Sequence, residues 1–393
     1  MVAHLPFRDG IGDQTRMQQR AAVVAGVGTT AYGRLPEHDA YSLGMWALTD
    51  ALRDASLTFA DIDGVIINRI PDYQRFCEIA GIDPQFVTIT PGHGRFAAIC
   101  MEMAGALVLS GRCRTVALVY GNDGRSAGAA YGGADDSYGS GGGGLWFPYG
   151  MTSPGAFHAL MIRRHMQMFG TTPEQLAQIS ITFRGHAGLN PNAVMRSPVD
   201  LDSYMAARMI CAPLRLLDYC LINDGGVALI VTSAERARDL AKPPVYVRGV
   251  ALQTAFANST FPPDDFWCDA LCSVTERSMT AAGLTRDDMS ALMIYDNFTP
   301  TVLFSLEGAG YCPVGEGGRF VAEGHLALGG RYPANTSGGH LSESYMQGWA
   351  LNVEAVRQLR GECDVRQVRD AANVHYLAAS PVCSSIVYSR DPS

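Results

Sequence analysis

Long apolar stretches are missing from this 393-residue chain. Its longest apolar runs, at residues 104–109 and 116–120, are far shorter than the roughly 20 residues that a membrane-spanning helix needs. Residues 1–20 contain no apolar core of the kind that a secretory signal requires, so we interpret them as a polar leader. These absences predict a cytoplasmic protein with no membrane span.

Clustered positive charge is also missing. The formal net charge is −8, and the basic residues form no run along the chain. Proteins that bind nucleic acids need concentrated Lys and Arg to neutralise phosphates. We therefore expect no nucleic-acid partner.

No two of the ten cysteines have the CxxC spacing of a structural zinc site. In a chain without an export signal, scattered cysteines are usually reduced and buried. We expect reduced, mostly buried thiols, and no metal site in this chain. The cysteines are Cys77, Cys100, Cys113, Cys211, Cys220, Cys268, Cys272, Cys312, Cys363 and Cys383.

Glycine is plentiful in one segment, residues 123–153, which includes a run of four glycines at 141–144. A phosphate-binding loop would also need a Lys-Ser or Lys-Thr pair, and this segment has none, so nucleotide hydrolysis is excluded. Loops of this length are usually functional or mobile. The segment is one candidate surface for a partner protein.

Strand and helix patterns alternate along the chain, and 47% of its residues are hydrophobic, enough for a sizeable core. In the first half, short apolar segments predict strands and amphipathic spacing predicts helices. A similar order then recurs from residue 244 onward. The pattern favours an α/β fold with a largely parallel sheet, built from two similar halves at 21–243 and 244–393, the first of which includes a loop region at 123–215. Predicted strands are 21–28, 62–68, 115–121, the end of 218–233, 244–251 and 292–295; predicted helices are 42–55, 97–109, 156–169, 172–187 and about 266–282.

Three motifs occur in an order that resembles the thiolase superfamily, in particular its sterol-carrier-protein-X or lipid-transfer type. They begin at Phe183 (Phe-Arg-Gly-His-Ala-Gly-Leu-Asn-Pro), Asn223 (Asn-Asp-Gly-Gly) and Asn335 (Asn-Thr-Ser-Gly-Gly). The resemblance implies a thiolase fold, which is a duplicated five-layer αβαβα arrangement with mixed sheets. It also implies a homodimer.

Two positions depart from the thiolase pattern. The nucleophilic cysteine of a thiolase would fall at about Gly94, where this chain has none, and Cys100 lies further along the same predicted helix, where we expect it to face the core. A catalytic histidine would fall on Tyr345. Without the cysteine, an acyl-enzyme cannot form by the thiolase route.

The sequence resembles most closely the thiolase-like aldolases of bacterial steroid side-chain degradation. Two motifs carry this resemblance: Tyr-Asp-Asn-Phe-Thr from Tyr295, and Asn-Thr-Ser-Gly-Gly-His-Leu-Ser-Glu-Ser-Tyr from Asn335 to Tyr345. The resemblance implies retro-aldol cleavage of a 17-hydroxy β-hydroxyacyl-CoA to propionyl-CoA and a 17-ketosteroid. It further implies a small OB-fold partner with a zinc ribbon in an α2β2 complex, where any zinc belongs to the partner. The coenzyme A is part of the substrate, and no cofactor is expected in this chain.

Retro-aldol cleavage needs proton-transfer groups, and we predict that Tyr345 and Tyr295 supply them. Donors for the thioester oxygen would be His186 and amides of the Gly338–Gly339 loop. The remaining predicted substrate-binding residues are Asn335, His340 and Asn297.

Simpler interpretations stand beside these roles. Most of the 16 tyrosines must pack in the core, and His186 could be a hydrogen-bonded residue at the end of a helix. His340 and His93 compete with it for an active-site role, while Asn223 and Asp224 are more typical of a turn. Two alternative functions also stay open: a condensing thiolase that uses Cys100 or Cys383, and a non-catalytic lipid-binding member of the family.

Overall fold

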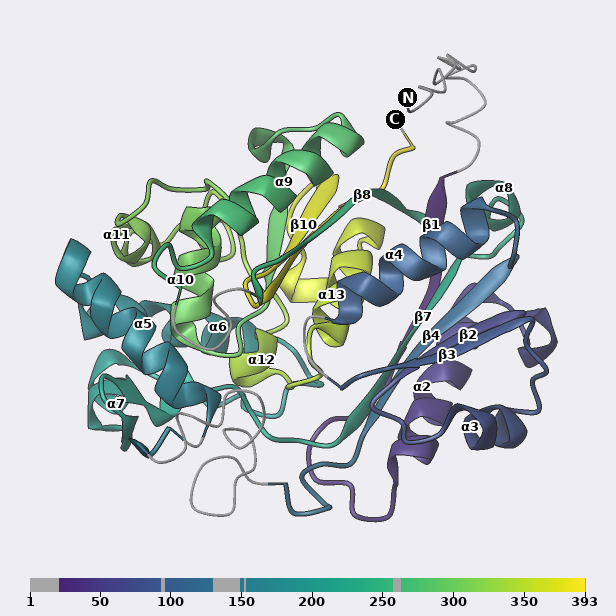
Figure 1. Cartoon of the computed structure of the whole chain (residues 1–393), viewed down its shortest axis with the longest axis horizontal. Coiled ribbons are helices and arrows are strands. Elements are labelled where there is room, and N and C mark those ends of the chain that lie inside the picture. The colour runs from purple at the N-terminus through teal and green to yellow at the C-terminus, as the bar shows by residue number, and fades with distance from the viewer. Residues whose placement is uncertain (1–20, 93–95, 130–148, 152, 257–262, 393) are drawn as a thin grey trace, which may run out of the picture.

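A computed structural model describes residues 21–92, 96–129, 149–151, 153–256 and 263–392. Its centre is a nine-stranded mixed sheet (Figure 1). The strands run in the order β3 (Phe86–Thr90), β2 (Gly64–Asn68), β4 (Thr115–Asn122), β7 (Gly225–Ser233), β1 (Ala22–Thr29), β8 (Val245–Thr254), β11 (Val382–Ser389), β10 (Asn373–Ala378) and β9 (Ala291–Ile294). The predicted polar leader and most of the glycine-rich segment lie outside the described residues.

The sheet consists of two parts with matching topology. In the first part, β1 pairs antiparallel with β7, β7 pairs antiparallel with β4, and β4 pairs parallel with β2. In the second part, β8, β11, β10 and β9 repeat this order and these directions. A short pairing of β1 with β8 joins the two parts. This repetition agrees with the duplicated fold, while the exact division at residue 243 stays a prediction.

The expectation of a largely parallel sheet is wrong. Parallel pairing is found for β2 with β3, β2 with β4, and β9 with β10. Strands β7 and β11 each lie antiparallel to both of their neighbours in the sheet. Alternating helices and strands predict α/β architecture, but they do not fix strand direction. Strand β7 is added after a long excursion from β4, whereas β11 directly follows its antiparallel neighbour β10.

Helices form three layers around the two parts of the sheet (Figure 1). Helices α2 (Ala40–Ala55) and α3 (Tyr73–Ala80) cover the outer face of the first part. Helices α4 (Phe96–Leu109) and α13 (Trp349–Arg360) lie between the parts, and α9 (Cys268–Ala282) and α10 (Thr299–Gly308) cover the outer face of the second. The five-layer thiolase-like α/β arrangement is thus confirmed.

Helix α2 illustrates how the sequence produces this packing. Asp39 and Ser42 form a capping box at its start, and its buried face carries Leu43 and Ala47. At Gly28 of β1 a Cβ atom would lie only 2.1 Å from the carbonyl oxygen of Ala47, so glycine is what lets this helix lie directly on the strand.

Most of the remaining elements pack together beside α10; they are α5 (Pro154–Phe169), α6 (Pro173–Gly188), α7 (Leu201–Ala206), the hairpin β5 (Met209–Cys211) and β6 (Leu214–Arg215), α11 (Gly317–Ala322) and α12 (Gly339–Ser342). Helix α8 (Ala234–Ala237) lies apart from them, against the start of β1. None of the helices in the described ranges has both the length and the apolar character that a membrane crossing requires.

Candidate active site

Two tyrosines from distant parts of the chain meet at the carboxyl end of β9. Tyr295 directly follows β9, and Tyr345 lies in the loop after α12. Their hydroxyl oxygens are 2.8 Å apart, which is hydrogen-bonding distance, and their rings make an edge contact at 63°. Tyr295 is buried and Tyr345 is half-buried. The structure therefore brings together the two residues that the sequence singled out for proton transfer.

Asn335 holds Tyr295 in place. Its side-chain oxygen accepts a 2.7 Å hydrogen bond from the Ile294 amide, and its side-chain nitrogen donates a 2.8 Å bond to the Ile294 carbonyl. These bonds extend the strand pairing at the very end of β9. The predicted role of Asn335 in substrate binding is not supported, because its amide group is occupied by backbone and serves to position Tyr295.

A chain of polar side chains holds Tyr345. The Tyr345 amide donates a 2.7 Å hydrogen bond to Oδ1 of Asn223, and Asn122 donates a 2.8 Å bond to the carbonyl of Asn223. Asn122 in turn accepts a 2.9 Å bond from Nε of Arg69. Arg69 and Asn122 were not predicted from the sequence. Both stand at the carboxyl ends of the parallel neighbours β2 and β4. Because such ends meet at one edge of a sheet, their positions could have indicated a shared site.

The glycine pair forms a tight turn against this assembly. A Cβ on Gly339 would lie 2.3 Å from Oδ2 of Asp296, whose carboxylate accepts hydrogen bonds from the His340 and Leu341 amides at the start of α12. The Gly338 amide donates to the carbonyl of Asn335. The Gly338 amide therefore cannot serve as the predicted donor to a thioester oxygen, because it is engaged within the turn.

His186 is also engaged by backbone. The Leu328 amide donates to its Nε2 at 3.2 Å, so the proton must sit on Nδ1, which lies 3.3 Å from the carbonyl of Asn335. Burial lowers the pKa of His186 and favours this neutral form. The predicted role as an oxyanion donor is not supported, since no N–H of the ring is left for a substrate. His186 instead buttresses the Asn335 turn.

His340 and Asn297, both predicted to bind substrate, have local roles. The Gly348 amide donates a 2.9 Å bond to Nε2 of His340, whose ring packs against both tyrosines with centroids 4.8 and 5.2 Å away. Nδ1 of His340 lies 3.1 Å from Asp296 without hydrogen-bond alignment. Asn297 accepts a 2.7 Å bond from Thr301 at the start of α10. The geometry gives these residues a positioning function.

The turn interpretation of Asn223 and Asp224 is not supported, because both residues hold segments that are distant in sequence. Both carboxylate oxygens of Asp224 accept hydrogen bonds, from the Leu35 amide and from the amide and hydroxyl of Ser126. His93 and Gly94, the region of the missing nucleophile, lie outside the described residues.

Burial raises the pKa of Tyr295 and of the two candidate thiols, with different consequences for each. Burial, together with the neighbouring Tyr345, raises the pKa of Tyr295 well above its usual value, so Tyr295 remains a phenol. Burial raises the pKa of the Cys100 and Cys383 thiols to about 12. Neither thiol has the lowered pKa that an activated cysteine nucleophile requires. Cys100 faces the core, as expected.

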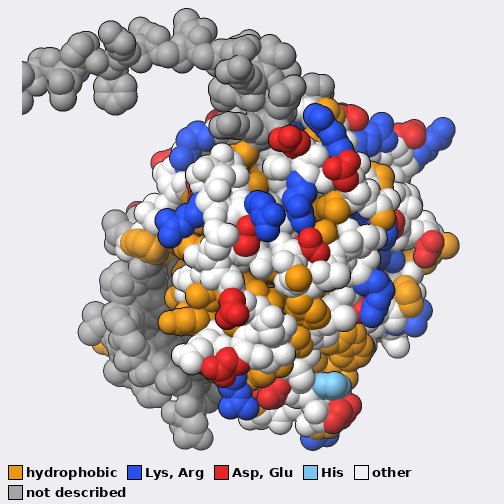
Figure 2. All heavy atoms as spheres, turned by 90° about the vertical axis from the view of Figure 1, so that its right-hand side faces the viewer, with side chains coloured by type: hydrophobic (Ala, Val, Ile, Leu, Met, Phe, Trp, Pro, Cys, Tyr) orange, Lys and Arg blue, Asp and Glu red, His pale blue; other side chains and the backbone are white. Residues whose placement is uncertain are grey.

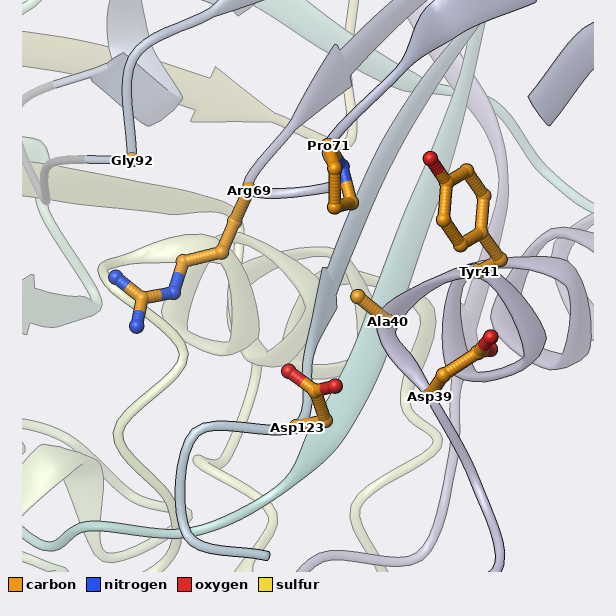
Figure 3. Close-up of a pocket in the computed structure, with 7 residues that line it drawn as sticks. All are labelled: Asp39, Ala40, Tyr41, Arg69, Pro71, Gly92 and Asp123. Carbon is orange, nitrogen blue, oxygen red and sulfur yellow. The ribbon is translucent and has the colours of Figure 1, made fainter. Parts of the chain in front are cut away.

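Two hollows lie near the pair, and one of them touches it. This inner cavity, of about 10 Å³, contacts Tyr345, Asn223, Gln347 and Arg69. An outer pocket of about 470 Å³, drawn in Figure 3, opens beside it and is lined by Asp39, Ala40, Tyr41, Arg69, Pro71, Gly92 and Asp123. Within the described ranges no group of three or more His, Cys, Asp or Glu side chains could hold a metal ion.

Comparisons with known proteins agree with this geometry. A family profile described as "Thiolase C-terminal domain-like" matches residues 257–385. The chain is 32% identical over 379 residues to the "Steroid side-chain-cleaving aldolase" of Thermomonospora curvata, covering 93% of this chain and 96% of that protein. It is 31% identical over 353 residues to the "17-hydroxy-3-oxo-4-pregnene-20-carboxyl-CoA lyase" of Mycobacterium tuberculosis, covering 86% and 92%. The solved structure "Ltp2-ChsH2(DUF35) aldolase" superposes with a TM-score of 0.87 at 31% identity, over 95% of this chain and 98% of that one.

Fold and site together define a thiolase-fold protein that carries a hydrogen-bonded pair of phenols at the carboxyl end of β9. With relatives this similar over nearly their whole length, the chain belongs to the family of thiolase-fold carbon–carbon lyases that these aldolases represent.

Proposed function

We propose that this enzyme cleaves a steroid side-chain β-hydroxyacyl-CoA of the 17-hydroxy type by a retro-aldol reaction. The products would be propionyl-CoA and a 17-ketosteroid. The observation that carries the proposal is the 2.8 Å contact between the Tyr295 and Tyr345 hydroxyls, in a site whose candidate thiols are buried. The names of the two similar proteins from Thermomonospora curvata and Mycobacterium tuberculosis support the substrate class.

The reaction needs one proton to move twice. The Tyr345 oxygen, as phenolate, takes the proton of the substrate hydroxyl, and the hydroxyl-bearing carbon becomes a ketone as its bond to the α-carbon breaks. The electron pair of that bond passes to the thioester as an enolate. Tyr345 then returns the proton to the α-carbon, which yields propionyl-CoA and regenerates the phenolate.

We assign the base to Tyr345 and the supporting donor to Tyr295. Tyr345 lines the inner cavity, whereas Tyr295 is fully enclosed behind it. Because burial keeps Tyr295 protonated, its hydroxyl can donate to the Tyr345 oxygen and stabilise a phenolate there. A phenol of ordinary pKa, roughly 10, would be a scarce base at neutral pH without such help.

We further propose that the working assembly has two components. The similar solved structure is named as a complex with a DUF35 protein, which supports the expected OB-fold, zinc-ribbon partner in an α2β2 arrangement. A homodimer of this chain would form at the free edge of the sheet, strand β3. Figure 2 views the molecule from the side that carries β3 and α3, where hydrophobic side chains gather on the lower half of the face.

Product analysis tests the proposal. The chain, alone and with its DUF35-type partner, is incubated with a 17-hydroxy steroid β-hydroxyacyl-CoA, and the products are identified by mass spectrometry. Equal amounts of propionyl-CoA and 17-ketosteroid are expected. Release of free coenzyme A with an acyl group on a cysteine would instead establish the condensing-thiolase alternative, and an unchanged substrate would favour the lipid-binding one.

A further inference from the structure

The proposed reaction requires a group that the tyrosine pair does not supply. When the bond to the α-carbon breaks, negative charge develops on the thioester oxygen, and hydrogen-bond donors placed there lower the barrier. The Gly338 amide and both nitrogens of His186 are occupied by backbone. With these groups engaged, a positively charged side chain elsewhere in the site is a candidate oxyanion donor.

Arg69 has the required position. It lines the inner cavity that touches Tyr345 and also the outer pocket, and it is the one residue in the described ranges that lines both. Among the described residues that line either hollow, it is the one that carries a positive charge. In Figure 3 its side chain extends from the end of β2 and its guanidinium points away from Tyr41.

The backbone of Arg69 is strained to reach this place. Its φ angle is +66°, a left-handed conformation that side chains other than Asn, Asp and Gly rarely adopt. Such strain is found preferentially at functional sites, where the surrounding structure enforces it.

The guanidinium is also fixed in direction. Nε donates to Asn122, the residue that connects through Asn223 to the Tyr345 amide. On its other side, the aliphatic part of Arg69 packs against Gly92, where a Cβ would lie 3.1 Å from Cδ. One network therefore orients both Arg69 and Tyr345 toward the same cavity.

We propose that Arg69 donates hydrogen bonds to the thioester oxygen and stabilises the enolate of the leaving propionyl-CoA. The inference rests on the proposed retro-aldol function and assigns it a further catalytic residue. Arg69 stays protonated throughout and exchanges no bond with the substrate. Its planar fork of N–H donors suits an oxyanion that forms next to a fixed base.

Enolate formation can be measured without the steroid. Propionyl-CoA is incubated with the enzyme, in complex with its partner, in ²H₂O, and loss of the α-protons is followed by mass spectrometry. We expect Arg69→Gly to lower the exchange rate at saturating propionyl-CoA by about 10²-fold or more, as for the loss of a typical oxyanion donor. Arg69→Lys should lose less, because it keeps the charge but not the fork. Arg75→Met, on the exposed side of α3, is the matched control and should exchange like the parent.

Arg69→Gly relieves the positive φ, which offsets stability lost with the Asn122 hydrogen bond, so its melting temperature should stay close to that of the parent. Lost exchange with a retained melting temperature supports the proposal. An exchange rate for Arg69→Gly within threefold of the parent rate would overturn the proposal. A second outcome would also overturn it: Arg69→Gly loses exchange because it unfolds, while Arg69→Lys exchanges at the parent rate. If the parent itself neither exchanges propionyl-CoA nor cleaves the steroid substrate, the proposed function fails instead.

Discussion

At the scale of single residues, the two phenols differ in what surrounds them. Tyr295 is enclosed on all sides, and its amide donates to the Leu377 carbonyl of β10. Tyr345 is half-buried and touches the cavity. A hydrogen bond between two such groups favours a proton on the more buried oxygen, because desolvation disfavours charge there.

Removing each tyrosine hydroxyl tests whether Tyr345 is the base and Tyr295 the supporting hydrogen-bond donor. Tyr345→Phe should lower kcat for steroid cleavage by at least about 10³-fold, since the base itself is lost. Tyr295→Phe should lower kcat by about 10-fold to 10²-fold. It should also move the ascending limb of the pH–rate profile, which reports deprotonation of Tyr345, to higher pH. Steady-state kinetics across pH measures both effects. Tyr73→Phe, at an exposed position of α3, is the control, and equal losses in the two site variants would contradict the assignment.

Glu343, two residues before Tyr345, offers a test of stability. It is buried, accepts hydrogen bonds from Ser337 and Asn190, and has its pKa raised to about 8 by burial and by the nearby Glu354. Because the folded pKa lies above the unfolded value, the group's stabilisation is complete below the unfolded pKa and falls as pH rises toward about 8.

We therefore expect Glu343→Gln to flatten the pH dependence of stability. Between pH 5 and pH 8.5, the urea midpoint of the parent should fall further than that of the variant, with a difference on the order of a few kcal/mol in the free energy of unfolding. Glu37→Gln, at an exposed site, should follow the parent. Parallel curves for Glu343→Gln and the parent would show that Glu343 titrates normally.

At the scale of elements, the short helix α12 organises the site. Asp296 caps its first amides, the preceding glycines bend the chain onto Asp296, and Asn335 completes the edge of β9. The helix is too short to be stable by itself, so these side chains determine where Tyr345 is placed.

A pair of glycine variants separates close packing from backbone strain. Gly339 and Gly81 have nearly the same φ, 60° and 63°, but a Cβ on Gly339 would meet Asp296 whereas one on Gly81 would meet nothing within 4 Å. Gly81→Ala should cost about 1–2 kcal/mol in the free energy of unfolding. Gly339→Ala should cost clearly more and abolish cleavage. Denaturant titration and activity assays check this, and equal costs would contradict the packing argument.

The sequence predicted about half of the helices and strands and gave no prediction for α3, β3, α10, α13, β10 and β11. Hydrophobic periodicity and capping residues identified α2, α4, α5, α6 and α9, and apolar runs identified β1, β4, β7, β8 and β9. The start of β2 was misplaced, because residues Phe59–Asp61 form a 3-10 helix that delays the strand to Gly64. The tyrosine pair was predictable because it lies in motifs with family resemblance.

The hydrogen-bond assignments could not be predicted. Asn335 and His186 occur where a catalytic donor would be expected, yet their polar atoms bond to backbone groups 41 and 142 residues away. His340 accepts a bond from the nearby Gly348 amide. Only the folded structure shows which donors remain for a substrate. Arg69 was not predicted because its contact with Asn122 joins segments that are 53 residues apart in the sequence.

At the scale of the whole molecule, both halves contribute to one site. Tyr295 and Tyr345 come from the second half, while Arg69 and the Asn122–Asn223 link come from the first. The short pairing of β1 with β8 and the shared helix layer of α4 and α13 hold the halves in register.

The free edge of the sheet provides a test of the proposed homodimer. Ile89 of β3 is 40% exposed on that edge, so Ile89→Lys should place a charge in the dimer interface and yield a monomer in analytical ultracentrifugation. Ile79→Lys, 51% exposed on neighbouring α3, is the matched control and should remain dimeric. A dimeric Ile89→Lys variant would place the interface elsewhere.

The central claim is that phenols have replaced the thiol in the chemistry of this thiolase fold. It is tested most directly by measuring steroid cleavage, under single-turnover conditions, for the parent, Tyr345→Phe and a Cys100→Ala/Cys383→Ala double variant. The account predicts that the double cysteine variant releases propionyl-CoA at a rate close to that of the parent, while Tyr345→Phe releases almost none. Loss of cleavage in a folded cysteine variant together with normal cleavage by Tyr345→Phe would contradict it.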